Sequence, residues 1–248
     1  LGGLASLISK IPAKNRLADF PHYLMHRAEQ LDNLYIFKNT EGTPENIRKF
    51  HPNIIVSSTG SAPLLPPIAG LKDRIDNENH NIYSILGMIS HINDFPKDLK
   101  GKKVVVVGGG AVGLDVVEFF ADRNADISIV EMMDQIGRDL DPVSKNDTKI
   151  MMKKHNVHQL TKTALLEVKD SSFLVKGDGE PYELPFEYGF VCLGMRAQGQ
   201  LYQNLTEEFS SEDVEIMNIG DSQRARRIID GTQEGRNILT ILEQKGYL

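Results

Sequence analysis

Hydrophobic positions in the middle of the chain change their spacing abruptly at a run of glycines. Two lysines and four valines at 102–107 lead into Gly108–Gly110, a pattern typical of a parallel strand buried on both faces. From Ala111 the apolar side chains recur near 3.6-residue spacing to about Asn124, which predicts an amphipathic helix. A second short strand over 127–131 completes a predicted strand–helix–strand unit.

The next segment predicts one more helix and then a group of short strands. Asp139, Asp141 and Pro142 supply capping candidates and an early-turn proline for a helix that runs to about His155. A third strand is expected at 157–160. Three short segments of strand-like sequence, with a Gly-Asp-Gly turn before the last of them, predict antiparallel hairpins. These segments are 164–168, 172–176 and 182–186.

Three further apolar strands each end at a glycine. They precede Gly60, Gly194 and Gly220, and the proline-rich residues 61–70 predict a crossing segment after the first of them. We therefore predict an α/β fold in which a Rossmann-like domain, with a parallel sheet and a β-meander, is inserted into a second, partial Rossmann-like domain. The predicted inserted domain covers 70–203, and the flanking domain covers 1–69 and 204–248.

Composition and charge exclude several classes of protein. The 248 residues carry 28 Lys and Arg against 34 Asp and Glu, and this acidic balance argues against a nucleic-acid partner. The single cysteine, Cys192, cannot form an internal disulfide, fits a reducing cytoplasm and is expected to be a packing residue. No run approaches the ~18 apolar residues of a membrane helix, and residues 1–10 lack the charged start of a signal peptide. We expect a cytoplasmic protein with no membrane partner.

The glycines between the first predicted strand and helix form a GxGxxG motif in the context that dinucleotide binding requires. Gly108 permits a tight turn, Gly110 lets the backbone approach a pyrophosphate, and Gly113 lets the helix pack closely on the strand. The helix amino terminus at Ala111–Val112 presents unpaired N–H groups to the phosphates. Glu131, roughly 20 residues further on, is placed to accept hydrogen bonds from ribose hydroxyls, which favours NAD(H) because a 2′-phosphate would be repelled. A glycine-rich turn in an α/β protein that binds no nucleotide is the alternative.

Five short motifs occur in the order seen in flavoproteins with two dinucleotide-binding domains. They are Leu1-Gly2-Gly3, Ser58-Thr59-Gly60, the glycine fingerprint, Leu193-Gly194-Met195-Arg196 and Ile219-Gly220-Asp221. With the closing run 220–231, they resemble the carboxy-terminal part of 2-enoate reductases and 2,4-dienoyl-CoA reductases. In these NADH:flavin oxidoreductases a flavin-binding barrel precedes the FAD and NAD(P)H domains.

This resemblance implies two cofactor sites. It places 70–203 as the NAD(H)-binding domain, and 1–69 with 204–248 as a partial FAD-binding domain. The residues that it implies for NAD(H) are Gly108, Gly110, Ala111, Val112, Gly113, Glu131 and Gly194. Those that it implies for FAD are Gly2, Gly3, Thr59, Gly60, Gly220 and Asp221, with Asp221 hydrogen-bonding the ribityl or pyrophosphate region.

The resemblance also implies a reaction in which NADH passes a hydride to FAD, for reduction of an enoate-type substrate on a barrel domain. The barrel and the family's first glycine fingerprint are not among these residues, so both are expected partners from a longer parent chain, and the isolated chain is expected to lack complete activity. We assign no catalytic residue, and the oligomeric state stays open. Two alternatives also stay open: an NAD-dependent dehydrogenase without flavin, and a non-catalytic NAD(H)-sensing or interaction module.

The remaining polar groups have simpler interpretations. His22 and His26 share one helix face, as zinc ligands do, but no glutamate follows His22, so a solvated face is preferred and no metal is expected. The three arginines 224, 226 and 227 are interpreted as a cofactor-side or domain-interface group.

Overall fold

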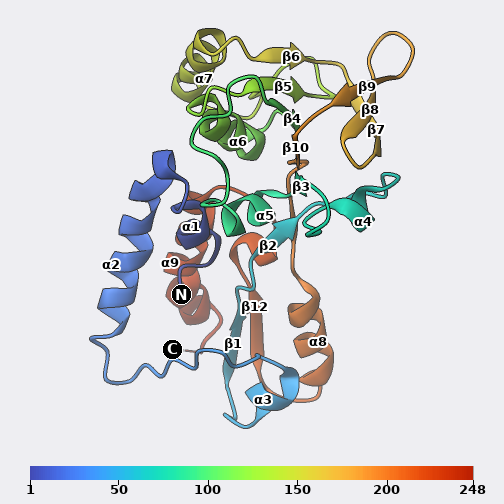
Figure 1. Cartoon of the computed structure of the whole chain (residues 1–248). Coiled ribbons are helices and arrows are strands. Elements are labelled where there is room, and N and C mark those ends of the chain that lie inside the picture. Colours follow the sequence, from blue (N-terminus) through green and yellow to red (C-terminus); the bar gives the residue numbers. More distant parts are fainter. Residues whose placement is uncertain (248) are drawn as a thin grey trace. The chain divides into compact units, whose positions relative to one another are not determined.

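The computed structural model describes residues 1–247, which divide into two compact units (Figure 1). The first unit contains Leu1–Ser6, Leu17–Ala62 and the chain from Met195 onward, and the second contains Leu7–Arg16 and Pro63–Gly194. The division points after Ala62 and Gly194 precede those expected after residues 69 and 203. The assignment of each unit to a cofactor remains a prediction.

A five-stranded parallel sheet in the order β3-β10-β4-β5-β6 forms the centre of the second unit. Its strands are β3 (Ile82–Tyr83), β4 (Lys103–Val107), β5 (Asp126–Val130), β6 (His158–Leu160) and β10 (Tyr188–Val191). All four valines of β4 are buried. Because successive side chains of a strand point to opposite faces, this burial requires a covering layer on each side, as the sequence predicts.

Helices cover one face of this sheet and a β-meander covers the other. The helices of the second unit are α4 (Leu71–Arg74), α5 (Ile85–Ser90), α6 (Ala111–Ala121) and α7 (Pro142–Lys154). Of these, α4 lies on the meander face, because its Leu71 packs in the same cluster as Phe173. Phe120 of α6 packs on Phe190 of β10 with 4.8 Å between ring centroids. On the other face, Phe173 and Val175 of the meander join Val105 and Val107 in one core cluster.

The predicted helix after Asp141 and the predicted hairpins are confirmed. The Asp141 carboxylate accepts the backbone N–H groups of Val143 and Ser144, Pro142 lies at the first helical position, and His155 is the C-cap. The meander is antiparallel. It consists of β7 (Ala164–Val168), β8 (Ser172–Lys176) and β9 (Tyr182–Pro185).

The first unit is built around two parallel strands, β1 (Ile54–Ser57) and β12 (Glu215–Asn218). A small core of Ile55, Leu205 and Phe209 joins β1 to α8. The helices of this unit include α2 (Asp19–Ala28), α3 (Pro44–Arg48), α8 (Gln200–Glu208), η2 (Gly220–Ser222) and α9 (Ile228–Gln244). The remaining elements of the chain are α1 (Gly3–Ile8), η1 (Pro12–Ala18), and the paired strands β2 (Ser61–Pro63) and β11 (Met195–Ala197). None of the helices described is both long and apolar enough to cross a membrane.

Candidate functional site

Two glycines allow close backbone packing around the turn between β4 and α6. Gly108 has a φ of +109°, and a Cβ at this position would overlap the carbonyl oxygen of Cys192. A Cβ at Gly113 would in turn overlap the carbonyl oxygen of Gly108. A larger residue at Gly113 would push the helix away from the strand, and one at Gly108 would push the turn away from the end of β10, so only glycine fits either position.

Gly110 differs from these two because its surroundings are open. It is the N-cap of α6, and no atom lies within 4 Å of the position that its Cβ would take. The first N–H groups of an α-helix have no intrahelical partners and carry a partial positive charge. Open space at this helix terminus fits the phosphates of a dinucleotide.

The carboxylate of Glu131 is fixed by two backbone groups. Glu131 directly follows β5, its Oε2 accepts the N–H of Gly109 at 2.6 Å, and its Oε1 accepts the N–H of Met133 at 2.7 Å. Gly109 was missed by the sequence reasoning, because the motif treats this position as variable. The available signal was that Gly109 extends the motif glycines into an uninterrupted run of three, 108–110.

These elements surround a cleft of about 580 Å³ in the second unit. The cleft lies at the carboxyl ends of β4, β5 and β10. Strand β4 pairs on one side with β5, the next strand along the chain, and on the other side with β10, a strand from much later in the chain. Ligands of open α/β sheets bind at this kind of switch point. Six of the predicted NAD(H) residues line it: Gly108, Gly110, Ala111, Val112, Glu131 and Gly194. The lining residues that the sequence did not indicate include Pro66, Ile68, Met132, Asp139, Thr163 and Leu165.

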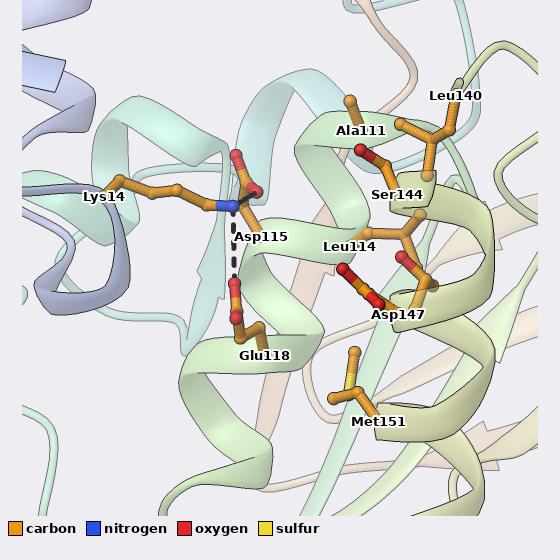
Figure 2. A pocket seen from close by; sticks show the side chains of 10 residues that line it. Lys14, Ala111, Leu114, Asp115, Glu118, Leu140, Ser144, Asp147 and Met151 are labelled. Atoms are coloured by element: carbon orange, nitrogen blue, oxygen red, sulfur yellow. Dashed lines mark ion pairs between the residues drawn. The ribbon is translucent and has the colours of Figure 1, made fainter. Parts of the chain in front are cut away.

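A second, smaller hollow of about 330 Å³ lies between α6 and α7 (Figure 2). Lys14 Nζ lies 3.0 Å from Asp115 Oδ1 and 3.4 Å from Glu118 Oε2, and the side chains of Lys14 and Asp115 are 31% and 23% exposed. Burial raises the pKa of Asp115 above its usual value even though Lys14 opposes this effect. Burial would lower the pKa of Lys14, but the carboxylates of Asp115 and Glu118 outweigh it and raise that pKa.

In the first unit, two glycine turns follow the carboxyl ends of β1 and β12. The strands are parallel, so Thr59-Gly60 and Gly220-Asp221 leave the same end of the pair. Ser61 Oγ donates to Asp221 Oδ2 at 3.0 Å, which joins the two turns directly. Gly60 and Gly220 have φ values of +79° and +66°, with no atom within 4 Å of either Cβ position.

Gly2 and Gly3, the other predicted FAD residues, lie at the start of α1. Gly2 has a φ of +88°, and its neighbours are the Ser6 and Pro21 side chains. Gly3 has a φ of +49° and open space at its Cβ position. The structure therefore joins the Thr59-Gly60 and Gly220-Asp221 turns, whereas Gly2 lies against the Ser6 and Pro21 side chains.

The remaining candidates have simpler structural explanations. Cys192 is free and buried, and burial raises the pKa of its thiol to about 12. His26 contacts Gln30, and in the described part of the chain no three metal-ligating side chains form a group that could hold a metal ion. Arg226 pairs with Glu234, and Arg227 pairs with Asp230.

Comparison with known proteins places these features in a wider group. A metal reductase of Desulforamulus reducens is 26% identical over 95% of this chain and 38% of its own length. An NADH oxidase of Thermoanaerobacter brockii is 24% identical over 95% of this chain and 35% of its own length. A solved 2-naphthoyl-CoA reductase complex matches with a TM-score of 0.78 and 22% identity, over 95% of this chain and 34% of its own. The chain thus spans little more than a third of the length of these proteins.

The sequence model of one protein family covers most of the chain. The model for pyridine nucleotide-disulphide oxidoreductases matches residues 26–217, which include the cleft and β1 with its glycine turn. The Rossmann-like fold expected from the glycine motif agrees with this match. The chain therefore belongs to the pyridine nucleotide-disulphide oxidoreductase family.

Proposed function

We propose that the second unit binds NADH in the cleft at the carboxyl ends of β4, β5 and β10. One observation carries this proposal: the glycine turn, the open amino terminus of α6 and the fixed Glu131 carboxylate line a single cleft. Gly110 and the first N–H groups of α6 bind the pyrophosphate. Glu131 accepts hydrogen bonds from the adenosine ribose hydroxyls.

The charges of the cleft favour NADH over NADPH. Glu131 and Asp139 both line it, and a 2′-phosphate on the ribose would bring negative charge toward these carboxylates. The relative named NADH oxidase supports the same cofactor.

We further propose that the first unit binds FAD through the joined turns at Thr59-Gly60 and Gly220-Asp221, and that Gly2 and Gly3 lie near the bound FAD. A strand–glycine–helix–strand unit outside these 248 residues completes the site. A comparison within the structure supports this. In the described residues β1 pairs only with β12, whereas β10, which also leads to a glycine turn, pairs with β3 on one side and with the glycine-loop strand β4 on the other. The second edge of β1 is where the completing strand would pair.

With both cofactors bound, NADH supplies a hydride and the flavin accepts it. The role of this chain is to bind and orient the two groups, so no acid–base side chain is required here. The resemblance of 220–231 to enoate reductases favours an unsaturated acid or acyl thioester as the final acceptor, on a barrel domain of a longer cytoplasmic protein. The chain spans only 38% and 35% of the length of two relatives, which supports a longer parent protein with further domains.

The proposal is tested by the visible absorbance of the purified chain, supplied with FAD and titrated with NADH without oxygen. Flavin bands that stay with the protein through gel filtration and bleach on NADH addition would support both sites. NADH fluorescence that changes without retained flavin would support the NADH cleft alone. Failure to bind either cofactor would overturn the proposal, and NADH binding without turnover in the full-length protein would favour a sensing module.

A further inference from the structure

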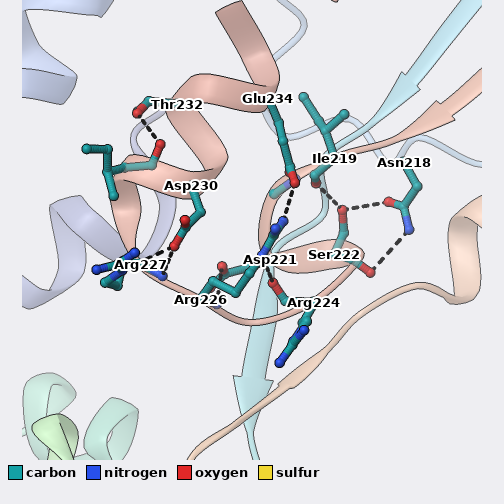
Figure 3. A network of polar contacts seen from close by, with 12 residues as sticks. Asn218, Ile219, Asp221, Ser222, Arg224, Arg226, Arg227, Asp230, Thr232 and Glu234 are labelled. Atoms are coloured by element: carbon teal, nitrogen blue, oxygen red, sulfur yellow. Dashed lines mark hydrogen bonds and ion pairs between the residues drawn. The ribbon is translucent and has the colours of Figure 1, made fainter. Parts of the chain in front are cut away.

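One side chain of α9 supports the turn that carries Asp221. Glu234 Oε2 accepts the backbone N–H of Gly220 at 2.6 Å, and Glu234 Oε1 pairs with the Arg226 guanidinium (Figure 3). Both side chains are partly buried, with 27% of Glu234 and 28% of Arg226 exposed. One carboxylate therefore ties the helix to the turn and to the loop between them.

The same loop fixes the Asp221 carboxylate. The backbone N–H of Arg226 donates to Asp221 Oδ1 at 3.0 Å, and Ser61 Oγ donates to Asp221 Oδ2 at 3.0 Å. Arg226 thus contacts Glu234 through its side chain and Asp221 through its backbone. A shift of the Glu234–Arg226 pair would move the N–H group that orients Asp221.

The Gly220 N–H has no partner on β1, because the backbone hydrogen bonds between β12 and β1 end one residue earlier. The Glu234 carboxylate supplies the acceptor instead. The N–H of Ile219 still donates to the carbonyl of Ser57 on β1, at 3.0 Å. Gly220 then turns into the left-handed region, with a φ of +66°, and its N–H points to Glu234 instead. The bond is charge-assisted at neutral pH, because Arg226 and the Gly220 amide both lower the pKa of Glu234.

We propose that Glu234 is a positioning residue for the FAD site: it holds the Gly220 turn and, through Arg226, sets the orientation of the Asp221 carboxylate toward the cofactor. This inference rests on the FAD site proposed above. Glu234 lies outside the glycine–aspartate motif, and its side chain contacts the motif at the backbone N–H of Gly220.

The first test measures amide hydrogen exchange at Gly220 in the chain labelled with ¹⁵N-glycine. In Glu234→Ala we expect Gly220 to exchange at least about tenfold faster, because a hydrogen bond to a charged acceptor is lost. Glu234→Gln keeps an acceptor oxygen and is expected to restore most of the protection. Glu243→Ala, an exposed glutamate on the same helix, is the matched control and should leave Gly220 unchanged.

The second test measures FAD affinity in the full-length protein with the same substitutions. We expect affinity to fall by about tenfold in Glu234→Ala and less in Glu234→Gln. Arg226→Met keeps the Gly220 bond but removes the counter-ion, so it should weaken FAD binding with little change at Gly220. This variant tests the role even if Glu234→Ala does not fold.

The two tests separate the possible failures. Unchanged Gly220 exchange in Glu234→Ala, or FAD affinity that is equal in all variants, would overturn the role of Glu234 while the FAD site stands. A wild-type protein that binds no FAD, although Gly220 responds to the substitution, would overturn the proposed FAD function and with it the positioning role.

Discussion

The Glu131 carboxylate accepts the backbone N–H of Gly109, with 2.6 Å between Gly109 N and Glu131 Oε2. This bond joins the end of β5 to the glycine turn after β4. The ribose-binding carboxylate and the phosphate-binding turn of the proposed NADH site are thus parts of one hydrogen-bonded arrangement. A substitution at Glu131 should affect both parts.

Replacing Glu131 with alanine should weaken NADH binding by roughly 10- to 100-fold, since hydrogen bonds to a charged group contribute about 1.5–3 kcal/mol. The loss includes the acceptor for the ribose hydroxyls and the support of the Gly109 amide. Isothermal titration with NADH measures the effect. Glu180→Ala, at an exposed turn, is the control and should bind NADH normally. Equal affinity in Glu131→Ala and the control would refute the assignment of the ribose site.

The glycines of the motif should separate into structural and ligand-binding positions. Gly113→Ala would overlap the carbonyl oxygen of Gly108 and should destabilise the chain by about 1–3 kcal/mol, seen as a lower Tm. Gly110→Ala meets no neighbour within 4 Å, so its Tm should stay near that of the wild type while NADH binding weakens. Normal NADH binding in Gly110→Ala would show that no phosphate lies at this terminus.

The elements around these glycines could be predicted from sequence because each has a local signal. The valine run predicted β4, the change of period predicted α6, and Asp141 with Pro142 predicted α7. Helix α9 was missed: Gly231 and Gly235 interrupt its pattern, and apolar side chains such as Leu239 are exposed. The two glycines lower the helix propensity of this segment, although its apolar side chains do gather on one face.

The parts of the candidate sites that escaped prediction are contacts between distant or unpatterned positions. Neither the Lys14–Asp115 pair nor the bond from Gly220 to Glu234 follows from any periodicity, because tertiary folding alone brings these groups together. The Asp139 side chain of the cleft was considered only as a capping candidate. Sequence motifs identified the backbone turns, and the structure was needed to find the side chains that support them.

Cys192 should be unreactive in the folded chain although it borders the cleft proposed to bind NADH. Burial raises the pKa of its thiol to about 12, so at pH 8 the thiolate fraction is roughly a thousandfold below that of an exposed cysteine. Ellman's reagent should react slowly with the native chain and rapidly after unfolding in urea. Rapid labelling of the native chain would contradict the burial of this thiol, and Cys192→Ser serves as the blank.

Removal of the Lys14 ammonium should produce a pH-dependent loss of stability. Asp115 has a raised pKa when folded, so the folded state binds its proton more tightly, and the cost of ionising Asp115 grows as pH rises above the unfolded value of 3.8. Lys14→Met raises that pKa further, so the variant should lose about 1 kcal/mol near pH 7 and less near pH 4.5. Urea unfolding at both pH values measures this difference, with the exposed Lys10→Met as control. A loss of equal size at the two pH values would show that Lys14 acts by packing and not through the charge of Asp115.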